Sequence, residues 1–202
     1  MSLVPRGAAT GARGVLAPIA RMLHRTGVSA NAVTVVGLAL TVIGAGFVAT
    51  GQPVQALLAL LLGSLADTLD GQVAKAAGGG TKLGAFLDST FDRISDAALA
   101  GSAVLLAFFA PYSLLVWPGL LLLVAGSLVP YMRAKAESLG LSASVGLAPR
   151  EARLVILVLG VAAWAVTSDP RFFAAAVSVV ALLATITAAQ RLAHVARALD
   201  NT

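Results

Sequence analysis

Four aspartates with helical spacing lie within an otherwise apolar part of the sequence. Asp67 and Asp70 are three residues apart, and Asp88 and Asp92 are four residues apart. Residues at these spacings share one face of an α-helix, so each pair directs two carboxylates to the same side. Three glycines at 78–80 separate the pairs and predict a tight turn between antiparallel helices. We therefore expect the four carboxylates to converge.

Carboxylates at these positions need a positive partner. An acid at the centre of a membrane-embedded helix costs about 2.5–3.5 kcal/mol on insertion scales, and four clustered anions also repel one another. Only Arg93 and Lys75 lie close in the sequence, and the chain contains no cysteine. Clustered carboxylates without His or Cys favour Mg²⁺, Mn²⁺ or Ca²⁺ over zinc. Two such ions that share carboxylates are a common arrangement for in-line displacement at phosphorus.

The composition indicates that these acids are carried by membrane helices. Of the 202 residues, 58% are hydrophobic and 11% are charged, whereas a soluble domain has about 25% charged residues. Residues 26–66 and 97–132 contain no charged side chain. Each stretch is too long for one span of about 20 residues and is interpreted as a helical hairpin. The expected helices cover residues 31–50, 54–77, 82–108, 114–138, 149–167 and 170–197.

Residues 10–25 are amphipathic and suit the membrane surface better than a span. The predicted fold is thus an all-α integral membrane protein, with six transmembrane helices preceded by an amphipathic interfacial helix. Residues 3–7, "LVPRG", match a protease-cleavage tag. Residues 1–9 are therefore expected to be a disordered or tag-derived start, and residues 10–202 a single domain.

The distribution of positive charge predicts the orientation in the membrane. Nearly all lysines and arginines fall at the N-terminus, the 78–80 turn, the 139–148 loop and the C-terminus, which share one side of a six-span bundle. Positive residues stay in the cytoplasm, so both termini and the carboxylates should be cytoplasmic, in the cell (inner) membrane. The net charge of +5 does not indicate nucleic acid, because aromatics are only 5% and the basic residues form no single solvated face.

One continuous motif carries a family resemblance. The pattern Asp67-x2-Asp70-Gly71-x2-Ala74-Lys75-x8-Gly84-x3-Asp88-x3-Asp92 resembles the signature of the CDP-alcohol phosphotransferase family at every spacing. The family usually has arginine where Lys75 stands, and a lysine keeps the charge but loses the bidentate fork. The stretch "SANAVT" at 29–34 is similar to the start of the family's first helix, with Ala30 in place of proline.

The resemblance implies a reaction and a set of roles. Family members have six transmembrane helices, usually form homodimers and use two divalent metals, with Mg²⁺ expected here and Mn²⁺ as a substitute. They transfer the phosphatidyl group of a CDP-linked lipid, CDP-diacylglycerol, to an alcohol and release CMP. Carried onto this chain, the metal ligands are Asp67, Asp70, Asp88 and Asp92, and Asp92 is also the general base. The expected contacts to the CDP-lipid are Asn31, Thr34, Gly71, Lys75 and Gly84.

Basic residues at the inner helix ends point to a phosphorylated acceptor, since a neutral alcohol would not need so many cations. The acceptor-phosphate candidates are Arg133, Lys135, Arg153 and Arg191. The stretches "RAKAE" and "PREAR" resemble bacterial phosphatidylinositol-phosphate synthases, whose acceptor is inositol 1-phosphate. Glycerol 3-phosphate is the competing acceptor, and contact with anionic membrane lipids is the simpler explanation of these charges. Arg150 is expected to contact a headgroup or Glu151, and Asp96 to pair with Arg93.

A function of another class fits some of the same features. Intramembrane carboxylates also carry ions or protons through transporters. A transporter would place its acids at the midplane and often contains an inverted repeat. The sequence has no convincing repeat, and its acids gather toward one side. A purely structural membrane scaffold explains none of the fixed spacings.

Overall fold

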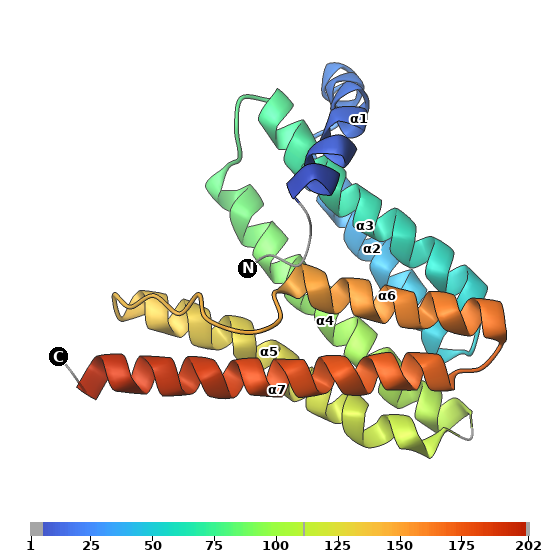
Figure 1. Ribbon diagram of the computed structural model, residues 1–202. Coiled ribbons are helices and arrows are strands. Elements are labelled where there is room, and N and C mark those ends of the chain that lie inside the picture. The colour runs from blue at the N-terminus through green and yellow to red at the C-terminus, as the bar shows by residue number, and fades with distance from the viewer. Residues whose placement is uncertain (1–5, 111, 201–202) are drawn as a thin grey trace.

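The computed structural model describes residues 6–110 and 112–200, and within them the chain is helical without a β-strand (Figure 1). A single 3-10 turn, η1 (Ser113–Leu115), precedes the fifth helix. The α-helices in chain order are α1 (Arg6–Arg25), α2 (Ala30–Ala49), α3 (Pro53–Ala76), α4 (Lys82–Phe109), α5 (Val116–Ser138), α6 (Arg150–Thr167) and α7 (Arg171–Asp200). Each predicted segment corresponds to one of these helices. Helix α1 begins at Arg6, within the stretch 1–9 that was expected to be disordered or tag-derived, and residues 1–5 lie outside the described part.

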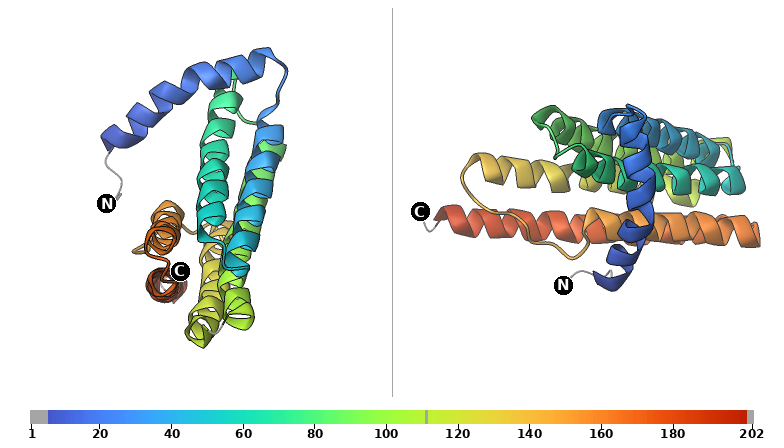
Figure 2. Two further views of the ribbon diagram at one scale, coloured as in Figure 1. Left: turned by 90° about the vertical axis from the view of Figure 1, so that its right-hand side faces the viewer. Right: turned by 90° about the horizontal axis from the view of Figure 1, so that it is seen from above.

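The helices form a bundle around an apolar core at the end away from the aspartates. Its most buried side chains include Leu106, Val161, Phe173 and Val180, contributed by α4, α6 and α7. A smaller cluster that includes Ala20 attaches α1 to α2 and α3. Helix α1 runs crosswise to the long axes of α2 and α3, whereas α6 and α7 lie side by side (Figure 2).

The connections between helices lie at two opposite ends of the bundle. The α3–α4 turn lies at the upper left of Figure 1, and the α5–α6 loop and the end of α7 lie at its left side. The α2–α3, α4–α5 and α6–α7 connections lie toward its lower right. The first group contains the segments that are rich in lysine and arginine. Positive charge is therefore concentrated at one end of the bundle.

Within residues 6–110 and 112–200, four segments are long and apolar enough to cross a membrane, namely α2, α3, the η1–α5 segment Ser113–Ser138 and α7. Helices α4 and α6 are not among them, because charged residues interrupt their apolar sequence. Arg150, Glu151 and Arg153 open the 18-residue α6, and Asp92, Arg93 and Asp96 lie within α4. Five of these charged residues, all except Glu151, form ion pairs with one another.

The starts of α2 and α4 are fixed by side-chain caps. The Ser29 hydroxyl accepts a hydrogen bond from the Ala32 amide at 3.2 Å, and the Thr81 hydroxyl accepts one from the Gly84 amide at 2.9 Å. Such caps satisfy amides that the first helical turn leaves unpaired. Between α3 and α4, Gly78 and Gly79 have φ angles of +94° and +128°, which only glycine adopts readily. This turn reverses the chain and brings Asp88 back beside α3.

Candidate active site

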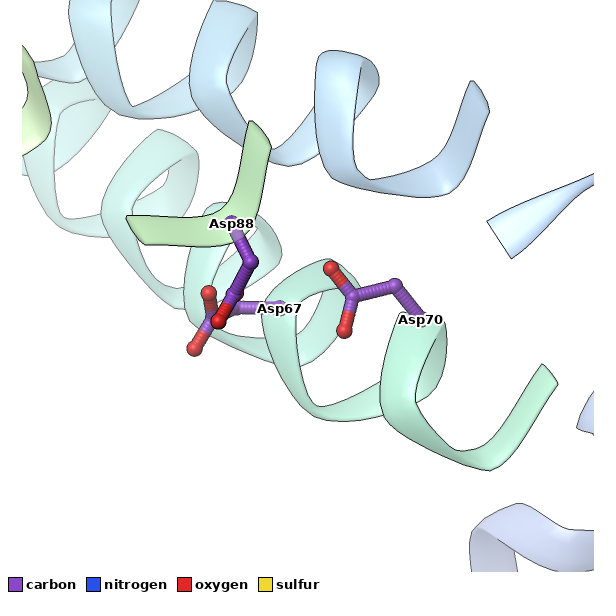
Figure 3. Close-up of side chains that lie close together, drawn as sticks. All are labelled: Asp67, Asp70 and Asp88. Atoms are coloured by element: carbon purple, nitrogen blue, oxygen red, sulfur yellow. The ribbon is translucent and has the colours of Figure 1, made fainter. Parts of the chain in front are cut away.

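Three of the predicted aspartates form a compact cluster between α3 and α4. Asp67 and Asp70 project from α3 and Asp88 from α4, and their carboxylates point toward one another (Figure 3). One carboxylate oxygen of each lies within 4.8 Å of the others. Asp70 is buried, with 8% of its surface exposed, whereas Asp67 and Asp88 are exposed. The cluster joins the two halves of the motif across the glycine turn.

This cluster has the composition of a site for a hard divalent cation. All of its donors are carboxylate oxygens, the ligands that Mg²⁺ and Mn²⁺ prefer. The Oδ2 atom of Asp70 is buried and has no hydrogen-bond partner within the described residues. A buried carboxylate oxygen left in this way is costly unless a cation balances it. The three residues therefore fit a divalent cation.

Asp92 lies beside the cluster but is bound to arginine. Its Oδ1 atom lies 2.8 Å from Nη1 of Arg150, and its Oδ2 atom lies 3.5 Å from Nη2 of Arg93. Asp92 lines the same small cavity, of about 30 Å³, as Asp67 and Asp88. The fourth predicted ligand is thus close to the cluster, while its charge is balanced by guanidinium groups.

Two ion pairs expected from the sequence next to Asp92 are absent among the described residues. Arg150 does not pair with Glu151 among the described ion pairs, and Asp96 is not the partner of Arg93. Instead, Nε of Arg150 lies 3.3 Å from Asp96 Oδ1, and Nη2 of Arg153 lies 3.8 Å from Asp96 Oδ2. Asp96 and Arg150 are 54 positions apart, so only the packing of α6 near α4 reveals the pairing. The one sequence signal was the unbalanced charge of Asp96, one turn beyond Asp92.

A larger cavity of about 650 Å³ adjoins the aspartate cluster. It lies among the end of α1, the start of α2, the end of α3 and the start of α4. Asp70 and Asp88 reach it, together with four of the predicted CDP-lipid contacts, Asn31, Thr34, Gly71 and Gly84. Lys75, the fifth, is exposed and does not line this cavity. Sequence reasoning did not identify three further lining residues, His24, Ser29 and Thr81.

Close packing at Gly84 shapes this cavity. A Cβ atom at this position would lie 3.2 Å from Oδ1 of Asn31 and 3.2 Å from Oγ1 of Thr81. Glycine therefore allows α4 to approach α2 closely enough to place Asn31 at the cavity wall. At Gly71, by contrast, a Cβ atom would meet nothing within 4 Å. Its missing side chain leaves space beside the carboxylates.

The four predicted acceptor residues differ in their surroundings. Arg153 is buried, with 7% of its surface exposed, and lines a cavity of about 40 Å³ with Arg93 and Asp96. Arg191 donates hydrogen bonds to the carbonyl oxygens of Val145 at 2.9 Å and Val129 at 2.5 Å. It thereby ties the α5–α6 loop and α5 to α7.

The other two are less enclosed. Arg133 is exposed and bound to Glu137 at 2.8 Å, and Lys135 is exposed. Arg191 is an electrostatic neighbour of both Arg133 and Arg153, so positive charge gathers at this end of α5, α6 and α7. No described cavity is lined by all four residues.

Comparison with known proteins gives a consistent result. The family described as CDP-alcohol phosphatidyltransferase matches residues 27–190. A phosphatidylinositol phosphate synthase of Mycolicibacterium smegmatis is 39% identical over 77% of this chain and 69% of its own length. An archaetidylinositol phosphate synthase of Methanothermobacter thermautotrophicus is 34% identical over 91% of this chain and 89% of its own length.

Solved structures agree with the sequence matches. The phosphatidylinositol phosphate synthase of Mycobacterium tuberculosis with CDP-DAG bound has a TM-score of 0.82 and 34% identity, covering 90% of this chain and 93% of that chain. The same enzyme with manganese and citrate has a TM-score of 0.81 and 34% identity, covering 89% and 88%. These matches favour a transferase over an ion transporter. The chain is a membrane enzyme that belongs to the CDP-alcohol phosphatidyltransferase family.

Proposed function

We propose that this enzyme transfers the phosphatidyl group of CDP-diacylglycerol to a phosphorylated alcohol and releases CMP. The observation that carries the proposal is the three-aspartate cluster at the wall of the 650 Å³ cavity. It supports a cation site next to a space large enough for a nucleotide, since ligand cavities typically measure about 300–1,000 Å³. A similar enzyme with CDP-DAG bound supports the same donor.

The proposed cation ligands are Asp67, Asp70, Asp88 and Asp92, which together would hold two Mg²⁺ ions, with Mn²⁺ as a substitute. The manganese-bound relative supports a divalent ion. When bound, these ions would neutralise the charge that develops on the pyrophosphate as its bond to phosphorus breaks. The protein supplies the ligands from two helices that a three-glycine turn connects, so the helices hold the carboxylates in place before the substrate arrives.

Asp92 is the proposed general base. The acceptor hydroxyl loses its proton to the Asp92 carboxylate while its oxygen forms a bond to the β-phosphorus of the donor. The bond from that phosphorus to the bridging oxygen then breaks, and CMP leaves with the electron pair. Asp92 lies one helical turn beyond Asp88, at the side of the cluster that faces Arg150 and α6. An acceptor bound near the basic ends of α5, α6 and α7 would approach from that side.

Asn31, Thr34, Gly71 and Gly84 are the proposed contacts to the CDP moiety, and all four line the larger cavity. Lys75 is retained only as a contact at the outer edge, because its side chain is exposed outside the cavity. For the acceptor phosphate we propose Arg133, Lys135, Arg153 and Arg191. Arg153 is the strongest of these candidates, because its guanidinium is buried beside a cavity, its contact with Asp96 is long at 3.8 Å, and its Nε atom has no hydrogen-bond partner among the described residues.

Inositol 1-phosphate is the favoured acceptor, and the names of the relatives support it. Glycerol 3-phosphate is the alternative, since it carries the same phosphate. The test supplies purified protein and Mg²⁺ with radiolabelled CDP-diacylglycerol and one acceptor at a time, chosen from inositol 1-phosphate, glycerol 3-phosphate, inositol and serine. We expect a labelled lipid product with inositol 1-phosphate only. Product with unphosphorylated inositol would contradict the proposed phosphate site, and no CMP release with any acceptor would contradict the reaction.

We also propose a placement in the cell membrane. Six helices, α2 to α7, would span the bilayer, with α1 at the cytoplasmic interface and both termini and the active site cytoplasmic. The crosswise direction of α1 and the basic end of the bundle support this arrangement. Residues 10–202 would form one domain, in contact with membrane lipids and paired with a second copy as a homodimer.

A further inference from the structure

We propose that Arg150 is a positioning residue that takes the place of a second cation at Asp92. Arg150 binds and neutralises this carboxylate, and a divalent ion that binds Asp92 has to displace it. The inference rests on the cation site of the proposed function and adds a competitor for one of its ligands. Arg150 itself is assigned no contact with the substrate.

The contacts of Arg150 are those of a bridging cation. Its Nη1 atom lies 2.8 Å from Asp92 Oδ1, and its Nε atom lies 3.3 Å from Asp96 Oδ1. The two carboxylates are one turn apart on α4, so a planar guanidinium can bind both at once. The three side chains are only 22%, 19% and 21% exposed. Partly buried pairs of this kind are screened less than pairs at the surface.

The position of Arg150 in its own helix also needs an explanation. It is the first residue of α6, and Pro149 before it offers no side-chain cap. A cation at a helix N-terminus is unfavourable, because the first amides and the helix dipole already place positive charge there. Carboxylates from α4 offset this cost. A headgroup contact would have left Arg150 exposed, whereas it lines the small cavity shared by Asp67, Asp88 and Asp92.

The charge balance leaves room for a second cation only if Arg150 moves. Five aspartates, at 67, 70, 88, 92 and 96, face three arginines, at 93, 150 and 153. None of the ion pairs found among the described residues involves Asp67, Asp70 or Asp88. These three can receive one cation without any exchange of partners. Oδ1 of Asp92 already lies 2.8 Å from Nη1 of Arg150, so a second cation that used this oxygen as a ligand would compete with the guanidinium.

Asp96 provides a place for Arg150 after this exchange. Nε of Arg150 already contacts Asp96, so Nη1 can leave Asp92 without leaving the guanidinium unpaired. Asp96 is also close to Arg153, at 3.8 Å. The network Asp92–Arg150–Asp96–Arg153 thus alternates in charge from the proposed cation site to the proposed acceptor site.

The test measures Mn²⁺ binding to the purified full-length chain without CDP-lipid, by the electron paramagnetic resonance signal of free Mn²⁺. Removing the competing guanidinium should let Arg150→Gln tighten the weaker Mn²⁺ site about tenfold, which corresponds to about 1.4 kcal/mol. In an Asp92→Asn background the same substitution should give no further gain, as in a double-mutant cycle. Arg171→Gln, at the opposite end of the bundle, is the matched control for a lost positive charge and should leave binding unchanged.

Arg150→Lys keeps a charge but loses the planar fork that places separate nitrogens on Asp92 and Asp96, so its affinity for Mn²⁺ should lie between those of the wild type and Arg150→Gln. This variant also keeps the proposal testable if Arg150→Gln does not fold. Unchanged or weaker Mn²⁺ binding in both variants would overturn the role of Arg150 while leaving the reaction intact. A gain that persists in the Asp92→Asn background would show a general charge effect and overturn it as well. If the wild type bound no Mn²⁺, the cation site itself would fail.

Discussion

Asp92 differs from the other motif aspartates in having cationic partners within the protein. Asp67, Asp70 and Asp88 face one another, whereas Asp92 contacts Arg150 and Arg93. A carboxylate paired in this way is held in its ionised form, the form in which it can accept a proton.

Asp92→Asn should lower kcat by about 10²–10⁴-fold, because the amide cannot take the acceptor's proton. The variant should stay folded, since asparagine has nearly the same shape. Release of CMP from CDP-diacylglycerol measures the first effect, and thermal unfolding in detergent measures the second. Asp200→Asn, an exposed residue at the end of α7, is the matched control. Normal turnover by Asp92→Asn would refute its assignment as the base.

Arg153 is the most buried cation of the proposed acceptor site. Arg153→Gln should raise the KM for the phosphorylated acceptor about tenfold or more, since hydrogen bonds to charged groups contribute about 1.5–3 kcal/mol. The KM for CDP-diacylglycerol should change little. A merely structural role would raise both values together, so steady-state kinetics with each substrate varied in turn distinguishes the two roles. Arg171→Gln serves as the control for loss of charge.

At the scale of elements, the contact between α2 and α4 decides the shape of the larger cavity. Gly84 allows this contact because a Cβ atom there would press on Asn31 Oδ1 and Thr81 Oγ1. Gly84 therefore lies next to both Thr81, which caps α4, and Asn31, which lines the cavity. A small change here should affect binding without unfolding the helix.

Gly84→Ala should raise the KM for CDP-diacylglycerol, because the added methyl group displaces Asn31 from the cavity wall. Gly101→Ala on the same helix is the matched control, since a Cβ atom there would meet nothing within 4 Å. Alanine favours a helix over glycine by about 1 kcal/mol, so Gly101→Ala should raise thermal stability and leave both KM values unchanged. An unchanged KM for the CDP-lipid in Gly84→Ala would contradict the assigned cavity.

The helices were predictable because their ends coincide with local signals, such as Pro53, the glycines at 78–80 and the positions of charge. The meeting of Asp67, Asp70 and Asp88 was predictable for the same reason, since a short turn connects their helices. The ion pair between Arg150 and Asp92 could not be predicted, because it depends on how α6 is placed relative to α4. Lys75 was assigned to the nucleotide by motif position, whereas its direction from α3 depends on the rotation of that helix.

At the scale of the whole molecule, the absence of cysteine from the sequence makes the orientation easy to test. Single cysteines can be placed at Ser138, at the end of α5, and at Gln52, between α2 and α3. Both positions are exposed. A membrane-impermeant maleimide should label Gln52→Cys in intact cells and Ser138→Cys only in inverted vesicles. The reverse pattern would invert the proposed topology and place the aspartates outside the cytoplasm.

The aspartates lie between the larger cavity on one side and the arginines of α6 on the other. The 650 Å³ cavity reaches them from α1, α2 and the α3–α4 turn, while Arg150 and Arg153 contact Asp92 and Asp96 from α6. The donor and the acceptor can therefore bind at separate places, and both substrates can be bound at the same time when the phosphatidyl group is transferred. Double-reciprocal plots of initial velocity, with both substrates varied, should intersect. Parallel lines would instead indicate a covalent phosphatidyl-enzyme that persists after CMP has left. With direct transfer, the configuration at phosphorus inverts once in every turnover.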